Sequence, residues 1–166
     1  LGTQQTPPNQ VLIAIALFLS LFIMQPTLTE IYNVALSPFL SESMSAEGAI
    51  SEASAVMKDF MVANTRSDTL LMFSDMAGAD GYESNADIPF STLLPSFITS
   101  ELKTAFQIGF LLFLPFLVID MVIASILMAL GMMMLSPMLV SLPFKLLLFV
   151  LVDGWALTVG SLAATF

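Results

Sequence analysis

A long apolar stretch with almost no charge constrains this chain more than any other feature. Residues 105–140 form a run of 36 residues in which Asp120 is the single charged side chain. As an α-helix this run would be about 54 Å long, which is too long for one bilayer span and short for two. Its breaks predict a long helix kinked near Pro115, a reversal at residues 131–137 and a returning helix over residues 139–163.

The start of the chain has the same character over a shorter length. Residues 2–10 are polar and contain paired prolines, which favour an extended lead-in. Residues 11–24 carry no charge, but these 14 residues are fewer than the roughly 20 that a membrane span needs. We expect Gln25-Pro26 to end or kink this helix. Such a short span indicates a helix that either extends into its flanks or packs inside a protein assembly.

The middle of the chain is an acidic insert. Residues 27–103 hold eleven of the thirteen acidic residues but only three basic ones, for a net charge of −8. Apolar side chains recur every three or four residues over residues 45–63, which predicts an amphipathic helix. Ser67 and Asp68 are typical of the N-cap and first turn of a second short helix. Residues 99–101 are expected to begin the helix that follows.

These patterns predict an all-α, membrane-type protein in three segments. Residues 1–26 form a polar lead-in and an apolar helix, and residues 104–166 form a long kinked helical hairpin with a methionine loop. Residues 27–103, between them, form a small helical insert outside the membrane. Because long loops with few basic residues escape the positive-inside preference, we expect this insert on the noncytoplasmic side.

Composition excludes several classes of function. Hydrophobic residues make up 57% of the chain and charged residues 10%, against about 25% charged in an average soluble domain. A net charge of −9 argues against nucleic acid as a partner. The absence of Cys and His removes disulfides, most zinc and haem ligation and Ser-His chemistry. We therefore expect neither a metal, a cofactor nor an enzymatic activity.

Met132, Met133 and Met134 follow Gly131 directly at the expected reversal. Methionine is unbranched and has a soft thioether, so three in a row give an apolar surface that can deform and reseal. Such a surface suits a gate, and we assign the three residues to a constriction. The competing interpretation is that they face lipid or fill a core.

Few charges lie in or beside the last 62 residues, and each needs a partner or water. An unpaired charge in such surroundings costs about 2.5–3.5 kcal/mol. Lys145 and Asp153 are eight residues apart, about 12 Å along a helix, which is too far for direct contact. Glu101 is the predicted partner of Lys145, through a neighbouring copy because the two heights disagree within one chain. Alternatively, each charge reaches a water-filled or protein-filled pocket, or Asp120 and Asp153 act as proton-relay carboxylates.

Five motifs give the chain a resemblance to a known family. The FliP family, the flagellar export-gate proteins of type III secretion, is similar to this sequence in LGTQQTPPNQ (1–10), SELKTAFQIGF (100–110), PFLVIDMVIAS (115–125), GMMM (131–134) and LPFKLLLFVLVDGW (142–155). The family usually has a further apolar segment upstream, so Leu1 is not expected to be the natural start.

The resemblance implies a ring of several copies, completed by FliQ-like and FliR-like subunits. Such a ring lies in the bacterial inner membrane at the flagellar basal body, with the acidic insert on the periplasmic side. Unfolded flagellar proteins pass through it, driven mainly by the proton motive force, and no reaction is catalysed. Three alternatives remain: the injectisome counterpart of this gate, a proton-coupled membrane transporter that uses Asp120 and Asp153, and a membrane scaffold without a pore.

Overall fold

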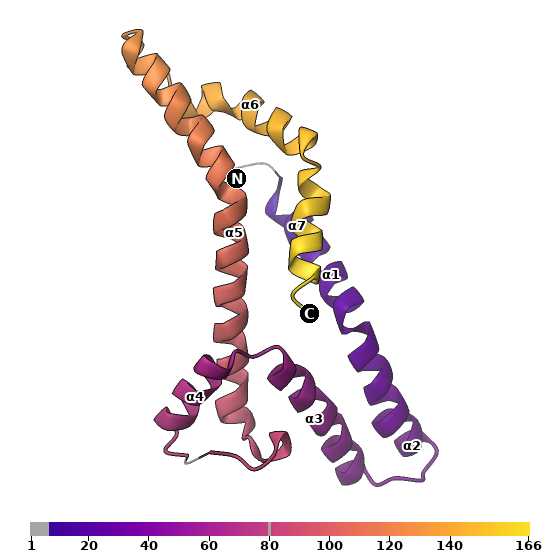
Figure 1. Ribbon diagram of the computed structural model, residues 1–166. Coiled ribbons are helices and arrows are strands. Elements are labelled where there is room, and N and C mark those ends of the chain that lie inside the picture. The colour runs from indigo at the N-terminus through magenta and orange to yellow at the C-terminus, as the bar shows by residue number, and fades with distance from the viewer. Residues whose placement is uncertain (1–6, 80) are drawn as a thin grey trace. The chain divides into compact units, whose positions relative to one another are not determined.

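The computed structural model describes residues 7–79 and 81–166, and every regular element in these ranges is a helix (Figure 1). This confirms the predicted all-α class, while the first six residues of the polar lead-in lie outside the described residues. In chain order the elements are α1 (Asn9–Ile31), the π-helix η1 (Tyr32–Leu36), α2 (Ser37–Leu40), α3 (Ala46–Ala63), α4 (Ser67–Met76), the 3₁₀-helix η2 (Asn85–Asp87), α5 (Phe90–Ala129), α6 (Pro137–Leu151) and α7 (Gly154–Ala163).

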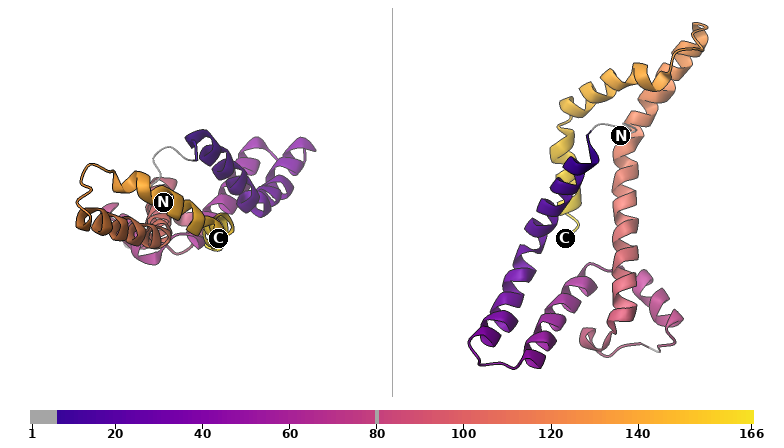
Figure 2. Two further views of the ribbon diagram at one scale, coloured as in Figure 1. Left: turned by 90° about the horizontal axis from the view of Figure 1, so that it is seen from above. Right: turned by 180° about the vertical axis from the view of Figure 1, so that it is seen from behind.

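The chain divides into two compact units. The first, which we call the hairpin unit, combines the N-terminal part of the chain as far as Leu19 with Ala105–Thr165. The second, the insert unit, comprises Ser20–Thr104 together with Phe166. Helices α1 and α5 are continuous ribbons in all views (Figure 2), and each therefore contributes one end to each unit.

Two helical segments, Asn9–Leu40 and Phe90–Ala129, are long and apolar enough to cross a membrane. Helices α6 and α7 meet the same test only as a pair, which is bent by 63°. This agrees with the membrane-type composition. The 40 residues of α5 correspond to about 60 Å of helix, roughly twice the thickness of a bilayer's hydrocarbon core. Only part of α5 can therefore lie in lipid.

Gln25-Pro26, which was expected to end or kink the first helix, does not end it. Helix α1 continues through Pro26 to Ile31, and η1 and α2 extend the helical segment to Leu40. A proline removes one backbone hydrogen bond but need not end a helix whose neighbouring groups find other partners. Close to the proline, the Thr29 hydroxyl donates to the Gln25 carbonyl at 2.8 Å. The short apolar run is thus part of a helix that extends into its C-terminal flank.

Helix α5 begins at Phe90, so the predicted start at residues 99–101 is wrong. The Pro89 carbonyl accepts the backbone N–H groups of the third and fourth following residues at 3.0 and 2.9 Å, which forms the first turn. Pro95 then lies within the helix. The hydroxyl of the buried Ser96 donates to the carbonyl four residues earlier at 2.6 Å, which adds a hydrogen bond in the turn that contains the proline.

The hairpin unit contains the predicted reversal, but its returning arm is two helices. Helix α5 runs through Pro115, and the single helix expected over residues 139–163 is instead α6 and α7. Asp153, between them, has a left-handed backbone with φ of 49°. A Cβ on the next residue, Gly154, would clash with the Phe149 ring, so the glycine permits this close packing. Aspartate tolerates the left-handed region better than most residues. Unlike glycine, however, an aspartate in the sequence does not predict that a helix ends there.

The insert unit has a small core beneath α3. As predicted, α3 follows Ser45, whose side chain accepts the Gly48 backbone N–H at 3.1 Å. The N-cap of α4 is Arg66 rather than Ser67, which is the first helical residue. The core is formed by the buried residues Met61, Ile88 and Leu93, with Met57, Phe60, Val62, Leu70, Tyr82 and Phe97 packed around them.

Candidate functional site: a methionine turn and a buried ion pair

The turn after α5 is closed by its own backbone. Gly131 adopts a left-handed conformation with φ of 72°. Its N–H donates to the Met128 carbonyl at 3.1 Å, and the Met132 N–H donates to the Leu127 carbonyl at 2.9 Å. This is the Schellman pattern, in which glycine ends a helix and the free carbonyls of the last turn are satisfied. The turn therefore holds its shape without help from side chains.

The three methionine side chains of this turn are left uncovered by their own chain. Met133 is 83% exposed and Met134 is fully exposed, while Met132 is about half exposed. The turn is the tip of the hairpin unit, between the end of α5 and the start of α6 (Figure 1). Exposed apolar surface of this kind is typical of a region that meets another protein or the membrane.

An ion pair joins the two arms of the hairpin. Lys145 Nζ on α6 lies 2.5 Å from Asp120 Oδ2 on α5. The Ser141 hydroxyl, one turn before the lysine on α6, donates to Asp120 Oδ1 at 2.5 Å. Lys145 is only 2% exposed and Ser141 is fully buried, whereas the Asp120 side chain keeps 29% of its surface. The Asp120 carboxylate thus binds both polar side chains of α6, Lys145 and Ser141.

Burial makes this ion pair important for the fold of the hairpin unit. Replacing a whole buried pair by apolar groups is often tolerated, but removing one member leaves an uncompensated charge and costs about 3–5 kcal/mol. Lys145 is only 2% exposed, so little of its side chain can reach solvent. Its ammonium therefore depends on Asp120, and the pair fixes α6 against α5.

The structure gives Lys145 a partner that the sequence analysis missed. Counted from Met134, Asp120 is 14 residues back and Lys145 is 11 residues forward, so the two lie at similar heights on antiparallel arms. Glu101 is 33 residues back. The count was available from the sequence and favours Asp120. Pairing of Lys145 with Glu101 of a neighbouring copy stays a prediction, because the structure contains one chain.

The remaining predicted residues lie apart from this pair. Glu101 belongs to the insert unit, is partly buried and lies within range of the positive charge of Arg66. Asp153 is exposed at the break between α6 and α7, and its side chain makes no capping hydrogen bond. Of the two acids suggested as proton-relay carboxylates, Asp120 is partly buried and Asp153 is exposed.

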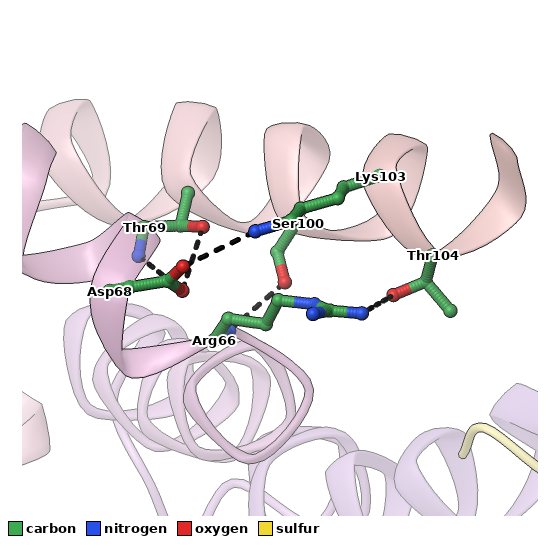
Figure 3. A network of polar contacts seen from close by, with 6 residues as sticks. All are labelled: Arg66, Asp68, Thr69, Ser100, Lys103 and Thr104. Atoms are coloured by element: carbon green, nitrogen blue, oxygen red, sulfur yellow. Dashed lines mark hydrogen bonds and ion pairs between the residues drawn. The ribbon is translucent and has the colours of Figure 1, made fainter. Parts of the chain in front are cut away.

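A second polar cluster fastens the start of α4 to α5 within the insert unit (Figure 3). The Arg66 backbone N–H donates to Ser100 Oγ at 3.0 Å, and its guanidinium donates to Thr104 Oγ1 at 3.2 Å. Lys103 Nζ lies 3.3 Å from Asp68 Oδ2. The hydrogen bond from Lys103 holds the pKa of Asp68 below its ordinary value. These groups hold the start of α4 against α5.

Neither cluster resembles a metal centre. Within residues 7–79 and 81–166, no group of three or more His, Cys, Asp or Glu side chains is placed to hold a metal ion. What the hairpin unit presents is an apolar tip, a neutralised charge pair beneath it and one exposed acid at its break. Such groups are better suited to contacts with other molecules than to catalysis of a reaction.

Comparison with known proteins gives consistent similarities. The model of the FliP family matches residues 1–162. "Flagellar biosynthetic protein FliP" from Cereibacter sphaeroides is 76% identical over 166 residues, which is 100% of this chain and 55% of that protein. Its namesakes from Buchnera aphidicola subsp. Acyrthosiphon pisum and Bacillus subtilis are 57% and 55% identical over the whole chain, which covers 44% and 75% of them. The chain thus spans about half the length of the first two.

Proposed function

The chain belongs to the FliP family, and from this membership we propose that it is a subunit of the protein-conducting export gate of the flagellar type III secretion system. Several copies, together with FliQ-like and FliR-like subunits, form a ring in the bacterial inner membrane at the flagellar basal body. Unfolded flagellar proteins pass through the ring. The subunit binds and guides its cargo without catalysing a reaction and without a cofactor.

The observation that carries this proposal is the uncovered methionine turn. A ring brings the turns of its copies together around one axis, so that Met132, Met133 and Met134 of each copy form an apolar constriction. A hydrophobic constriction closes by dewetting, and flexible thioether chains adapt to an extruding chain of changing shape. The Asp120–Lys145 pair supports the gate by fixing the arm that follows the turn to α5.

Two other functions receive less support. The injectisome counterpart of the gate would use the same geometry, but the relatives reported above carry flagellar names, which favours the flagellar branch. A proton-coupled transporter would use Asp120 and Asp153 as relay groups. A relay carboxylate exchanges its proton with neighbouring titratable groups, whereas Asp120 is bound in an ion pair with Lys145 and accepts a hydrogen bond from the Ser141 hydroxyl.

The gate is tested by replacing Met132, Met133 and Met134 with alanine together. This triple variant removes most of the occluding volume without adding a charge, so the complex should assemble while its membrane leaks ions or small solutes. The measurement is dye or ion efflux from vesicles that contain the purified complex. Alanine at the exposed Met72 and Met76 of α4 is the matched control and should not leak. An assembled triple variant as tight as the parent would place the seal elsewhere.

The same proposal puts the acidic insert, residues 27–103, on the periplasmic side as a soluble helical layer. Glu83 is exposed, and the chain has no native thiol, so Glu83→Cys provides a single reactive position. A membrane-impermeant maleimide added to the periplasmic side should label it in intact cells. Labelling that requires lysis of the inner membrane would reverse the topology.

A further inference from the structure

Methionine supplies every sulfur atom in this sequence. The 166 residues contain 12 methionines and no cysteine. Hydrogen peroxide and related two-electron oxidants convert the methionine thioether to a sulfoxide, which is polar where the thioether was apolar. Because the sequence offers no thiol to react first, two-electron oxidation at sulfur in this chain falls on methionine.

The turn after α5 holds the most accessible of these sulfur atoms. Met134 is fully exposed and Met133 is 83% exposed, which are the two largest exposed fractions among the twelve methionines. Met61, in the core of the insert unit, is only 4% exposed. An oxidant has to reach the sulfur atom to react with it, so exposure ranks the methionines by their susceptibility. The half-exposed Met132 adds a third sulfur atom to the same turn.

The turn can gain oxygen atoms at sulfur without losing its shape. The hydrogen bonds that close it join backbone atoms only, and residues 132–134 lie between α5 and α6 rather than inside a helix. Exposed sulfoxide oxygens are free to bind water. In a core, by contrast, the same oxygen would lack a hydrogen-bond partner and would disturb the packing. Oxidation at the turn therefore changes its polarity and leaves the fold intact.

We propose that Met132, Met133 and Met134 form a reversible oxidation site that opens the seal of the gate. The sulfur lone pair attacks one oxygen of hydrogen peroxide, and the O–O bond breaks as the S–O bond forms. The other peroxide oxygen leaves with both protons as water, so the sulfur loses two electrons and the peroxide gains them. This inference rests on the proposed function, because the sulfoxides affect the seal only if the turns form the constriction.

Oxidation opens the constriction because it removes the reason for dewetting. Apolar walls exclude water from a narrow passage, whereas sulfoxide oxygens accept hydrogen bonds from water and keep the passage filled. The change is reversible, since methionine sulfoxide reductases restore the thioether, with one enzyme for each sulfoxide epimer. The same three side chains thus seal the passage in the reduced state and open it in the oxidised state.

The position of the oxidation site is tested by mild peroxide treatment of vesicles that contain the purified complex. Mass spectrometry of digested samples gives, for each methionine, the fraction that has gained one oxygen atom. Met133 and Met134 should be oxidised first and the buried Met61 last. Equal rates at the turn and at Met61, or no added oxygen at the turn, would overturn the proposal.

The effect on the seal is measured as dye or ion efflux from the same vesicles before and after peroxide. Efflux should rise about tenfold or more once the turn is oxidised, and both reductases together should reverse the rise. Leucine at all three positions of the turn keeps apolar side chains of similar volume but removes the sulfur. Peroxide should therefore leave the efflux of this variant at its own untreated value. Leucine at the exposed Met72 and Met76 of α4 is the matched control and should respond to peroxide as the parent does.

Two results would refute the oxidation site while leaving the gate in place. One is a parent complex that carries sulfoxides at the turn and stays tight. The other is a leucine variant of the turn that leaks after peroxide as much as the parent does. Failure of the proposed function looks different, because the untreated alanine variant of the turn would then be as tight as the untreated parent.

Discussion

Lys145→Glu is expected to abolish assembly of the complex. The substitution places a second carboxylate beside Asp120, in a position that is only 2% exposed. Breaking a buried pair costs about 3–5 kcal/mol, which is a large share of the roughly 5–15 kcal/mol by which proteins are stable. The measurement is the amount of assembled complex, extracted from membranes and resolved by native electrophoresis. Assembly at the parental level would show that the pair is dispensable.

Second-site variants separate the observed pair from the one predicted across copies. Combining Lys145→Glu with Asp120→Lys restores opposite charges within the chain and should recover part of the assembly. Combining it with Glu101→Lys should recover assembly only if Lys145 also meets Glu101 of a neighbouring copy. Lys145→Met is the neutral reference, since it removes the ammonium but leaves Asp120 with the Ser141 hydroxyl.

Gly154→Ala is expected to destabilise the hairpin unit strongly. A Cβ at Gly154 would clash with the Phe149 ring, which itself packs near two other aromatic rings. The ring centroid of Phe149 lies 5.4 Å from that of Trp155 and 6.4 Å from that of Phe116. Overpacking of a filled site typically costs about 1–3 kcal/mol. Trp155 is the single tryptophan and packs on the displaced ring, so its fluorescence during thermal unfolding in detergent reports the loss directly.

Gly160→Ala in the same helix is the matched control for Gly154→Ala. Nothing lies within 4 Å of a Cβ placed at Gly160. Alanine in a helix interior is favoured over glycine by about 0.5–1 kcal/mol, so this variant should unfold at the same temperature as the parent or slightly above it. Equal unfolding temperatures for Gly154→Ala and the parent would refute the packing argument. Phe149→Leu combined with Gly154→Ala should relieve part of the damage.

Local patterns predicted the helical class, the amphipathic helix α3 and the reversal at Gly131, because each depends on residues close together in the chain. The prolines show the limit of such local rules. Pro26, which was expected to end or kink the first helix, lies inside α1, and Pro95 lies inside α5, whose start was predicted at residues 99–101. Whether a proline ends a helix depends on what satisfies the freed carbonyl and covers the ring, which composition does not reveal.

Only part of the polar cluster around Lys145 could be predicted from the sequence. The cost of a charge in apolar surroundings correctly implied that Lys145 has a partner, and the partner itself required the register of two antiparallel arms. Ser141 gave no signal, because a serine in an apolar helix satisfies itself on its own backbone as readily as it meets a neighbour. Nor does the sequence indicate the break between α6 and α7 at Asp153. Aspartate adopts the left-handed conformation seen there only where the surrounding fold requires it.

The turn after α5 contains one position that its backbone restricts to glycine, followed by three that its backbone leaves open. Any L side chain at Gly131 would be strained by its φ of 72°, even though no atom lies within 4 Å of its Cβ. The two hydrogen bonds that close the turn join backbone atoms only. Met132, Met133 and Met134 can therefore be exchanged for other apolar residues without loss of the turn. The size and flexibility of the tip can thus be altered one side chain at a time while the turn that presents these side chains is kept.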